Sequence, residues 1–190
     1  MLFIYIHGFN SSPASFKAQC FSQFLARQHG HDVFIAPQLA DSPLAAMTQL
    51  SELIEEKQIH QDISLIGSSL GGFYATSLAH QYGLKATLIN PAVNPQIRLL
   101  DYLGKNKNYH TGVEYDLTHE HIKQLDTIDI ASIETVGKLQ VLLQTGDKVL
   151  DYRLAQSKYR ACQLIIEQGG DHSFVHFDSH CSAIYQFLKS

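Results

Sequence analysis

Short, nearly continuous apolar runs alternate along the chain with longer stretches in which apolar residues recur every three or four positions. A continuous run is typical of a parallel strand covered on both faces, and the longer period is typical of an amphipathic helix. The runs predict six strands, at residues 2–6, 32–36, 62–66, 85–89, 139–144 and 162–167. Because helical stretches separate them, we expect an α/β fold with a doubly wound, mainly parallel sheet and right-handed crossovers.

Three apolar stripes predict helices. Their members are Phe16, Cys20, Phe21, Phe24 and Leu25 in the first, Leu44, Met47, Leu50 and Ile54 in the second, and Phe177, Cys181, Ile184 and Leu188 in the third. The pairs Ser12-Pro13 and Ser42-Pro43 each predict a helix start, with serine as the N-cap and proline at the first helical position.

Residues 94–137 separate the fourth and fifth strands by more than an ordinary crossover. Within them, Leu117, His121, Leu125 and Ile128 have approximately helical spacing. Two interpretations stay open. The segment is either an extended crossover helix with a surface loop or a small cap over a site, since long insertions are often functional.

Composition narrows the possible classes of protein. A chain of 190 residues fits one domain, so we expect residues 1–190 to fold together. A net charge of −4 without a Lys/Arg cluster argues against a nucleic-acid partner, and the longest apolar runs are too short to span a membrane. The three cysteines and the absence of a leader-like N-terminus predict free thiols in a cytoplasmic protein.

Residues 67–72 read Gly-Ser-Ser-Leu-Gly-Gly, directly after the third predicted strand. This is a G-x-S-x-G pattern, which can hold a serine exposed on a sharp turn from strand to helix. Gly67 and Gly71 fix the phase, so Ser69 rather than Ser68 is the candidate nucleophile. The same letters also occur in glycine-rich loops that merely pack a helix on a sheet, so partners elsewhere in the chain decide between the two.

Such partners follow in the order Ser, Asp, His that this pattern requires. Asp147 comes just after the fifth predicted strand, and His172 follows a glycine turn after the sixth. Ligand sites in open parallel sheets form at the carboxyl ends of the strands, where all three side chains would meet. Asp151 is a rival acid but is better interpreted as a helix N-cap, and Asp171 as a loop residue.

The first predicted strand ends in His7-Gly8-Phe9-Asn10, which is similar to the oxyanion loop of lipases and esterases. We expect the backbone N–H of Phe9, with Asn10 as second choice, to bind an oxyanion together with the N–H of Leu70. His7 is expected to order this loop rather than act as the base.

A metal or cofactor is not expected. His172, His176 and His180 recur every four residues, as ligands on one helix face can, but no H-E-x-x-H motif accompanies them. Neither G-x-G-x-x-G nor a P-loop motif is present.

Taken together, HGFNSSP, GSSLGGFYAT, LINPAVNP, TGDKVLD and GGDHSF resemble the small bacterial YqiA-like esterases of the α/β-hydrolase superfamily. The resemblance covers essentially the whole chain. It implies a compact α/β-hydrolase fold with strand order 2-1-3-4-5-6, helices on both faces and a small insertion between strands 4 and 5. It also implies hydrolysis of acyl esters or acyl thioesters, including acyl-CoA.

The sequence therefore predicts a cofactor-free serine hydrolase in which Ser69, Asp147 and His172 form an acyl-enzyme. Two alternatives stay open, a catalytically idle fold used for binding and a perhydrolase that uses the same three residues. We expect segment 94–137 to supply the wall that selects the acyl chain, through Leu99, Leu100, Tyr102, Leu103 and Tyr109. Phe9 and Phe73 are expected beside the nucleophile.

Overall fold

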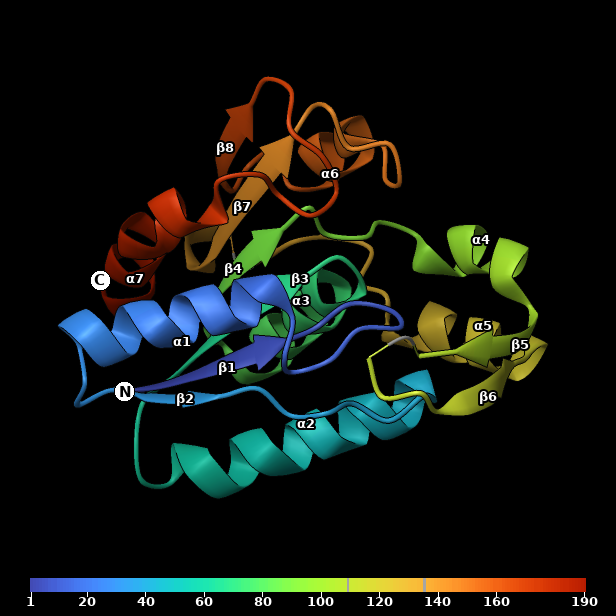
Figure 1. The fold of residues 1–190 in the computed structure, drawn as a ribbon, viewed down its shortest axis with the longest axis horizontal. Coiled ribbons are helices and arrows are strands. Elements are labelled where there is room, and N and C mark those ends of the chain that lie inside the picture. Colours follow the sequence, from blue (N-terminus) through green and yellow to red (C-terminus); the bar gives the residue numbers. More distant parts are fainter. Residues whose placement is uncertain (109, 135) are drawn as a thin grey trace.

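A computed structural model of the chain describes residues 1–108, 110–134 and 136–190. Its main sheet has six strands, all paired in parallel, in the order β2-β1-β3-β4-β7-β8 (Figure 1). The strands are β1 (Leu2–Ile6), β2 (Val33–Ile35), β3 (Ile63–Ser68), β4 (Lys85–Ile89), β7 (Leu139–Gln144) and β8 (Gln163–Glu167). Since β7 and β8 are the fifth and sixth predicted strands, the predicted order is confirmed, and β1 lies directly beside β3.

Helices cover both faces of this sheet because alternate strand residues bury in opposite directions. On one face, Phe3 of β1 packs edge-to-face on Phe21 of α1 (Phe16–Gln28), beside α7 (Cys181–Lys189). On the other, Ile4 belongs to a core shared with α2 (Pro43–Gln58), α3 (Leu70–Tyr82) and α6 (Tyr152–Lys158). In Figure 1, α1 and α7 accordingly lie on the side of the sheet opposite α2.

Only one of the two predicted helix starts is correct. Ser42 precedes α2 and Pro43 is its first residue, although the Ser42 hydroxyl donates to Gln124 instead of capping the helix. The prediction at Ser12-Pro13 is wrong, because α1 begins at Phe16 with Ser15 as its N-cap residue. Ser12 instead forms a turn, in which its hydroxyl accepts from the Ala14 N–H and its carbonyl from the Ser15 N–H.

The segment between β4 and β7 forms several small elements, most of them beyond the carboxyl ends of the strands (Figure 1). They are α4 (Pro95–Leu99), a 3₁₀ turn (Leu100–Tyr102), the antiparallel hairpin β5 (Gly104–Lys107) and β6 (Glu114–Leu117), α5 (His119–Ile128) and a second 3₁₀ turn (Val136–Lys138). The expected helix is α5, which buries Ile122, Leu125 and Ile128, but Leu117 belongs to β6. The sequence did not predict the hairpin.

The three cysteines, Cys20, Cys162 and Cys181, are free thiols. No helix in the described part of the chain has the length and apolar character needed to cross a membrane. A 3₁₀ turn (Phe177–His180) leads into α7, so the third predicted stripe begins in this turn and continues through the helix.

Candidate active site

Ser69 occupies the sharp turn between β3 and α3, with φ 57° and ψ −123°. A residue with a side chain rarely adopts a positive φ, so surrounding contacts must hold it there. The Ser69 N–H donates to the carbonyl oxygen of Ile89 (3.0 Å), and the Ser69 carbonyl accepts from the N–H groups of Gly72 (2.9 Å) and Ala92 (3.0 Å). Strand β4, the loop that follows it and the first turn of α3 thus hold Ser69 in this conformation.

The flanking glycines allow close backbone contact at this turn. A Cβ on Gly67 would fall against the carbonyl group of Gly71, and one on Gly71 would fall against the carbonyl oxygen of Ile6. Neither glycine has a positive φ, so steric space rather than conformational freedom requires glycine at both positions. The same turn buries Ser68 and places Ser69 beside a cavity, so Ser69 rather than Ser68 has the position of a candidate nucleophile.

The structure brings Ser69, His172 and Asp147 into one hydrogen-bonded row. His172 Nε2 lies 3.1 Å from Ser69 Oγ, and His172 Nδ1 lies 2.7 Å from Asp147 Oδ2. The histidine side chain is 28% exposed and the aspartate side chain 1%. The ring therefore faces the solvent side of the site while the carboxylate behind it is shielded.

Asp147 is held ionised although it is buried. Burial alone would raise the pKa of this carboxyl, but hydrogen bonds from His172 and from the N–H groups of Leu150 and Val149 hold it below its ordinary value. Both backbone donors reach Oδ1, at 2.9 and 2.8 Å, which leaves Oδ2 for the histidine. A buried anion so placed can orient an imidazole and stabilise its protonated form.

The two other acids near the row have different partners. Asp151 is the N-cap of α6, as predicted, where its Oδ1 accepts from the Arg153 N–H (3.0 Å) and pairs with the Arg153 side chain. Asp171 accepts from the backbone N–H and the hydroxyl of Ser173. Both carboxylates are paired with residues two positions further along the chain, and neither takes part in the hydrogen-bonded row.

Two buried amide side chains, which the sequence analysis missed, hold the loop that carries His172. Asn90 donates to the carbonyl oxygens of Asp171 (3.0 Å) and His172 (3.4 Å) and accepts from the N–H of Gln144. Gln144 Oε1 accepts from the N–H groups of Asp171 (3.1 Å) and Val175 (2.9 Å). Asn90 follows β4 and Gln144 ends β7. This position at the carboxyl ends of strands is the sequence signal that could have identified both residues.

Lys17 supports the same loop from α1. Its ammonium group donates to the Ser173 carbonyl oxygen (2.9 Å). Burial lowers the pKa of Lys17 to about 8, although the carboxylates of Asp171 and Asp147 act in the opposite direction. A cationic side chain thus lies close enough to the Asp147–His172 pair to affect it electrostatically.

The loop after β1 lies against Ser69. A Cβ on Gly8 would be 3.1 Å from Ser69 Cβ, so the two backbones almost touch. His7 orders this loop, since its Nε2 accepts from the Leu39 N–H (3.2 Å) and its Nδ1 lies 3.0 Å from the Gly8 carbonyl oxygen. An N–H can only donate, so the proton of a neutral His7 is on Nδ1. Burial lowers the pKa of His7, which favours this neutral form.

Phe9 and Leu70 both line the cavity beside Ser69, and neither of their backbone N–H groups donates to another residue of the described chain. Two N–H groups so placed next to a candidate nucleophile could donate hydrogen bonds to a developing oxyanion. Their role as oxyanion donors stays a prediction.

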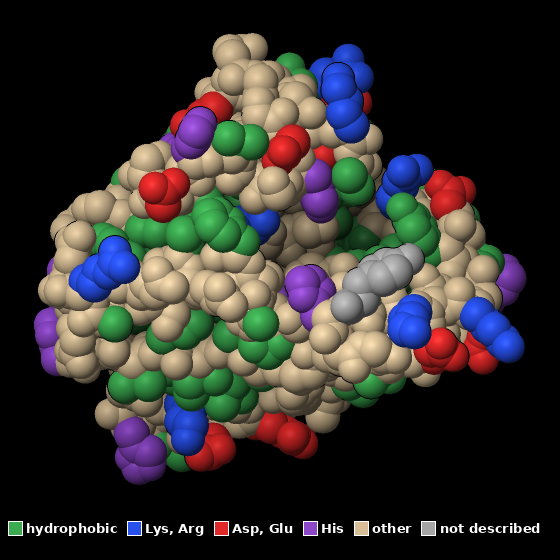
Figure 2. All heavy atoms as spheres, viewed as in Figure 1, with side chains coloured by type: hydrophobic (Ala, Val, Ile, Leu, Met, Phe, Trp, Pro, Cys, Tyr) green, Lys and Arg blue, Asp and Glu red, His purple; other side chains and the backbone are tan. Residues whose placement is uncertain are grey.

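This cavity has a volume of about 220 Å³ and reaches from Ser69 and His172 to segment 94–137, which contributes Leu99 and Tyr102. Figure 2 shows that this face of the molecule is hollowed, with hydrophobic and histidine side chains along the hollow. Leu100 and Leu103 do not line the cavity, and Tyr109 lies outside the described residues. Phe73 is buried in the core behind the site rather than exposed beside it.

The histidines after His172 have other surroundings. His180 Nε2 lies 2.9 Å from Glu167 Oε1, and His176 adopts a left-handed conformation before the 3₁₀ turn. Within residues 1–108, 110–134 and 136–190, no three His, Cys, Asp or Glu side chains are grouped so that they could hold a metal ion.

Comparison with known proteins finds a matching family and relatives of similar length. The family described as "Uncharacterised protein family (UPF0227)" matches residues 2–189. The chain belongs to the UPF0227 family. It is 24% identical over 193 residues to a UPF0227 protein of Shewanella woodyi and 23% identical over 194 residues to one of Shewanella sediminis. The first alignment covers 99% of each chain and the second 100%, and the match is consistent with the YqiA-like resemblance.

Solved structures with the same fold include esterases and hydrolases. Alpha/beta hydrolase domain-containing protein 10 from mouse has a TM-score of 0.80 at 15% identity, covering 99% of this chain and 89% of its own. Est1E of Butyrivibrio proteoclasticus, solved with ferulic acid, has a TM-score of 0.76 at 16% identity, covering 99% and 88%. The esterase domain of a Rhodothermus marinus protein reaches 0.67 at 13%, covering 99% and 85%. The fold is therefore that of the α/β-hydrolases, as predicted.

Proposed function

We propose that this protein is a serine hydrolase that cleaves acyl esters or acyl thioesters through Ser69, His172 and Asp147. The observation that carries the proposal is the row from Ser69 Oγ through His172 to Asp147, with separations of 3.1 and 2.7 Å, at the mouth of a largely apolar cavity. Esterases and hydrolases among proteins of this fold support the reaction class.

The first half of the reaction forms an acyl-enzyme. Ser69 Oγ attacks the carbonyl carbon of the substrate while its proton passes to His172 Nε2. The carbonyl oxygen becomes an oxyanion, which the N–H groups of Phe9 and Leu70 stabilise. The tetrahedral intermediate then collapses, and the proton on Nε2 goes to the departing alkoxide or thiolate.

Water completes the cycle. His172 Nε2 removes a proton from a water molecule, which attacks the acyl carbon and forms a second tetrahedral intermediate. When that intermediate collapses, the acid leaves and Ser69 regains its proton from His172. Asp147 stays ionised throughout and keeps the histidine proton on Nδ1.

A pair of serine variants tests the proposal. Ser69→Ala is expected to lose kcat for an acyl ester by at least about 10³-fold while its circular dichroism spectrum stays unchanged, because the hydroxyl is needed for chemistry and little for packing. Ser68→Ala is the matched control and should keep most of the activity. Full activity in Ser69→Ala would refute the proposed nucleophile.

A further inference from the structure

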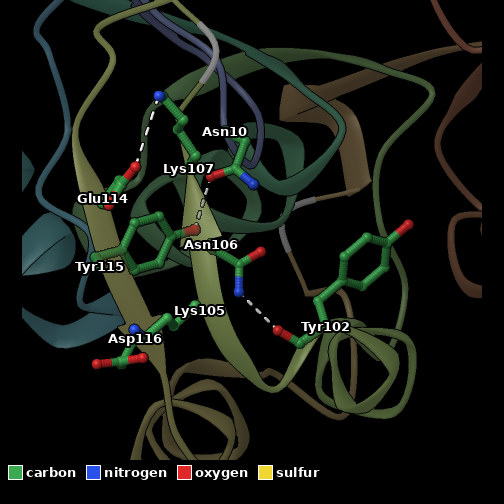
Figure 3. A pocket seen from close by; sticks show the side chains of 8 residues that line it. All are labelled: Asn10, Tyr102, Lys105, Asn106, Lys107, Glu114, Tyr115 and Asp116. Carbon is green, nitrogen blue, oxygen red and sulfur yellow. Dashed lines mark hydrogen bonds and ion pairs between the residues drawn. The ribbon is translucent and has the colours of Figure 1, made fainter.

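Side chains of the β5–β6 hairpin form hydrogen bonds to Asn10 and Ser11 in the loop after β1. Tyr115 of β6 donates its hydroxyl to Asn10 Oδ1 at 2.7 Å, as Figure 3 shows. Asn108, which follows β5, donates its Nδ2 to the Ser11 carbonyl oxygen at 2.8 Å. The hairpin is therefore connected to two consecutive residues of the loop, directly after Phe9.

Aromatic packing adds a third connection. The Phe9 ring meets Tyr102 with centroids 5.6 Å apart and Tyr115 with centroids 6.5 Å apart, both in edge-to-face geometry. Tyr115 thus contacts the side chains of Phe9 and Asn10 together. Movement of β6 would be transmitted to both residues.

The loop needs such support at Asn10. Its φ is 50°, in the left-handed region, which asparagine tolerates better than most residues but does not prefer. The hydrogen bond from Tyr115 ties its side chain in place. Burial, and next the Asp41 carboxylate, raises the pKa of Tyr115, so this donor keeps its proton at neutral and moderately alkaline pH.

Asn108 is itself firmly oriented. Its Oδ1 accepts from the backbone N–H groups of His110 (2.9 Å) and Thr111 (3.1 Å), so its Nδ2 is left to face Ser11. The residue is only 5% exposed. One buried asparagine therefore organises the hairpin turn and reaches the loop.

We propose that the β5–β6 hairpin clamps the oxyanion loop, with Tyr115 and Asn108 as positioning residues that act through the backbone N–H of Phe9. The proposal rests on the proposed function, because it assigns the hairpin a part in transition-state stabilisation. Oxyanion donors help a reaction only when they are in place before charge develops. A clamp on Asn10 and Ser11 keeps the adjacent N–H aimed without touching the substrate.

Tyr115→Phe tests the clamp while preserving the ring packing. We expect kcat for an acyl ester to fall about 10-fold with KM changed less than 2-fold. This loss is smaller than the 10²–10³-fold cost of removing an oxyanion donor. A trifluoromethyl ketone, whose adduct with a serine hydroxyl carries an oxyanion, should bind about 10-fold more weakly. The matched control is Tyr82→Phe, which removes an equally short tyrosine hydrogen bond (2.7 Å, to Glu55) far from the loop and should change neither value.

A double-mutant cycle tests whether Tyr115 acts through Asn10. Asn10→Gly removes the acceptor and suits the left-handed backbone, so it should reproduce the loss seen in Tyr115→Phe. The double variant should lose no more than the more affected single variant. Additive losses would show that the two side chains act independently and would overturn the clamp, as would unchanged kcat and ketone affinity in Tyr115→Phe.

Hydrogen–deuterium exchange separates failure of the clamp from failure of the proposed function. The amides of residues 8–12 should exchange faster in Tyr115→Phe than in the wild type and Tyr82→Phe. Equal exchange in all three proteins would overturn the clamp, whatever the activity. A wild type that neither hydrolyses esters nor binds the ketone would refute the proposed esterase activity instead. The exchange rates would still show whether the hairpin holds the loop.

Discussion

Asp147 and Asp151 lie four residues apart, yet their surroundings give them different tasks. Asp147 is buried behind His172 with two backbone donors on its other oxygen, whereas Asp151 is exposed, caps α6 and pairs with Arg153. The first can orient and stabilise an imidazolium. The second stabilises a short helix.

This difference predicts opposite effects of the same substitution. Asp147→Asn should lower kcat by about 10³–10⁴-fold, because the amide favours the wrong histidine tautomer. Asp151→Asn should leave kcat unchanged and lower the free energy of unfolding by at most about 1 kcal/mol, since asparagine also caps helices. Steady-state kinetics and urea denaturation of both variants measure this, and the reverse kinetic pattern would move the acid role to Asp151.

Lys17 provides a pH-dependent test at the same scale. Its pKa is about 8 in the folded protein, whereas an unfolded chain keeps the lysine proton up to about pH 10.4. Between these values the unfolded state binds more protons, so Lys17 makes wild-type stability rise with pH. Lys17→Met lacks this contribution.

We therefore expect Lys17→Met to be more stable than the wild type below pH 8, by about 1–3 kcal/mol, since one pKa unit corresponds to about 1.4 kcal/mol and water still reaches part of the side chain. The advantage should shrink as pH rises from 8 to about 10.5. Urea denaturation at pH 7, 8.5 and 10 measures it. A difference between the two proteins that stays constant over this range would contradict the buried, charge-bearing role of Lys17.

Among the elements, segment 94–137 contributes most to what surrounds the nucleophile. Its α4 and the following 3₁₀ turn line the cavity, its hairpin contacts the loop after β1, and α5 packs into the core. Because α5 is part of the core, removing the whole segment would expose buried apolar surface. Single substitutions in the segment are therefore the better test of its role in acyl selection.

Leu99→Ala should shift the acyl-length preference toward longer chains, because it extends the apolar cavity. Each added methylene that fits is worth about 0.8 kcal/mol, or roughly 4-fold in kcat/KM. Values for C2 to C16 esters measure this shift, and acetyl ester turnover should change little. Leu100→Ala is the matched control, since Leu100 is 45% exposed and does not line the cavity. The same profile in both variants would place acyl selection elsewhere. If Leu99→Ala does not fold, Leu99→Val should show a smaller shift in the same direction.

The elements that the sequence predicted are those whose pattern is set by burial. The strands carry continuous apolar runs, so their positions were predicted to within two residues. Strand β5 reads Gly-Lys-Asn-Lys and is mostly exposed, so it has no apolar pattern from which a hairpin could be predicted. The start of α1 was misplaced because Ser12 forms a local turn that resembles a cap in sequence.

At the scale of the whole molecule, the parallel sheet gathers the candidate site. Ser69, Asp147 and His172 are separated by 25 to 103 positions, yet each follows a strand whose carboxyl end reaches the same edge. The position of each residue just after a strand of a parallel sheet therefore predicted that these three side chains meet. The contacts of Asn90, Gln144 and Tyr115 depend on how individual loops fold. The spacing of apolar residues along the sequence therefore does not predict these contacts.

The central claim is that Ser69 is an activated nucleophile, and covalent labelling tests it most directly. A fluorophosphonate reacts with a serine hydroxyl that a neighbouring histidine deprotonates, and fluoride leaves as the phosphorus–oxygen bond forms. Tandem mass spectrometry of the treated wild type should find one adduct, on Ser69, which is absent in Ser69→Ala and strongly slowed in His172→Ala. An unlabelled wild type, or an adduct on Ser68 or another serine, would contradict the account.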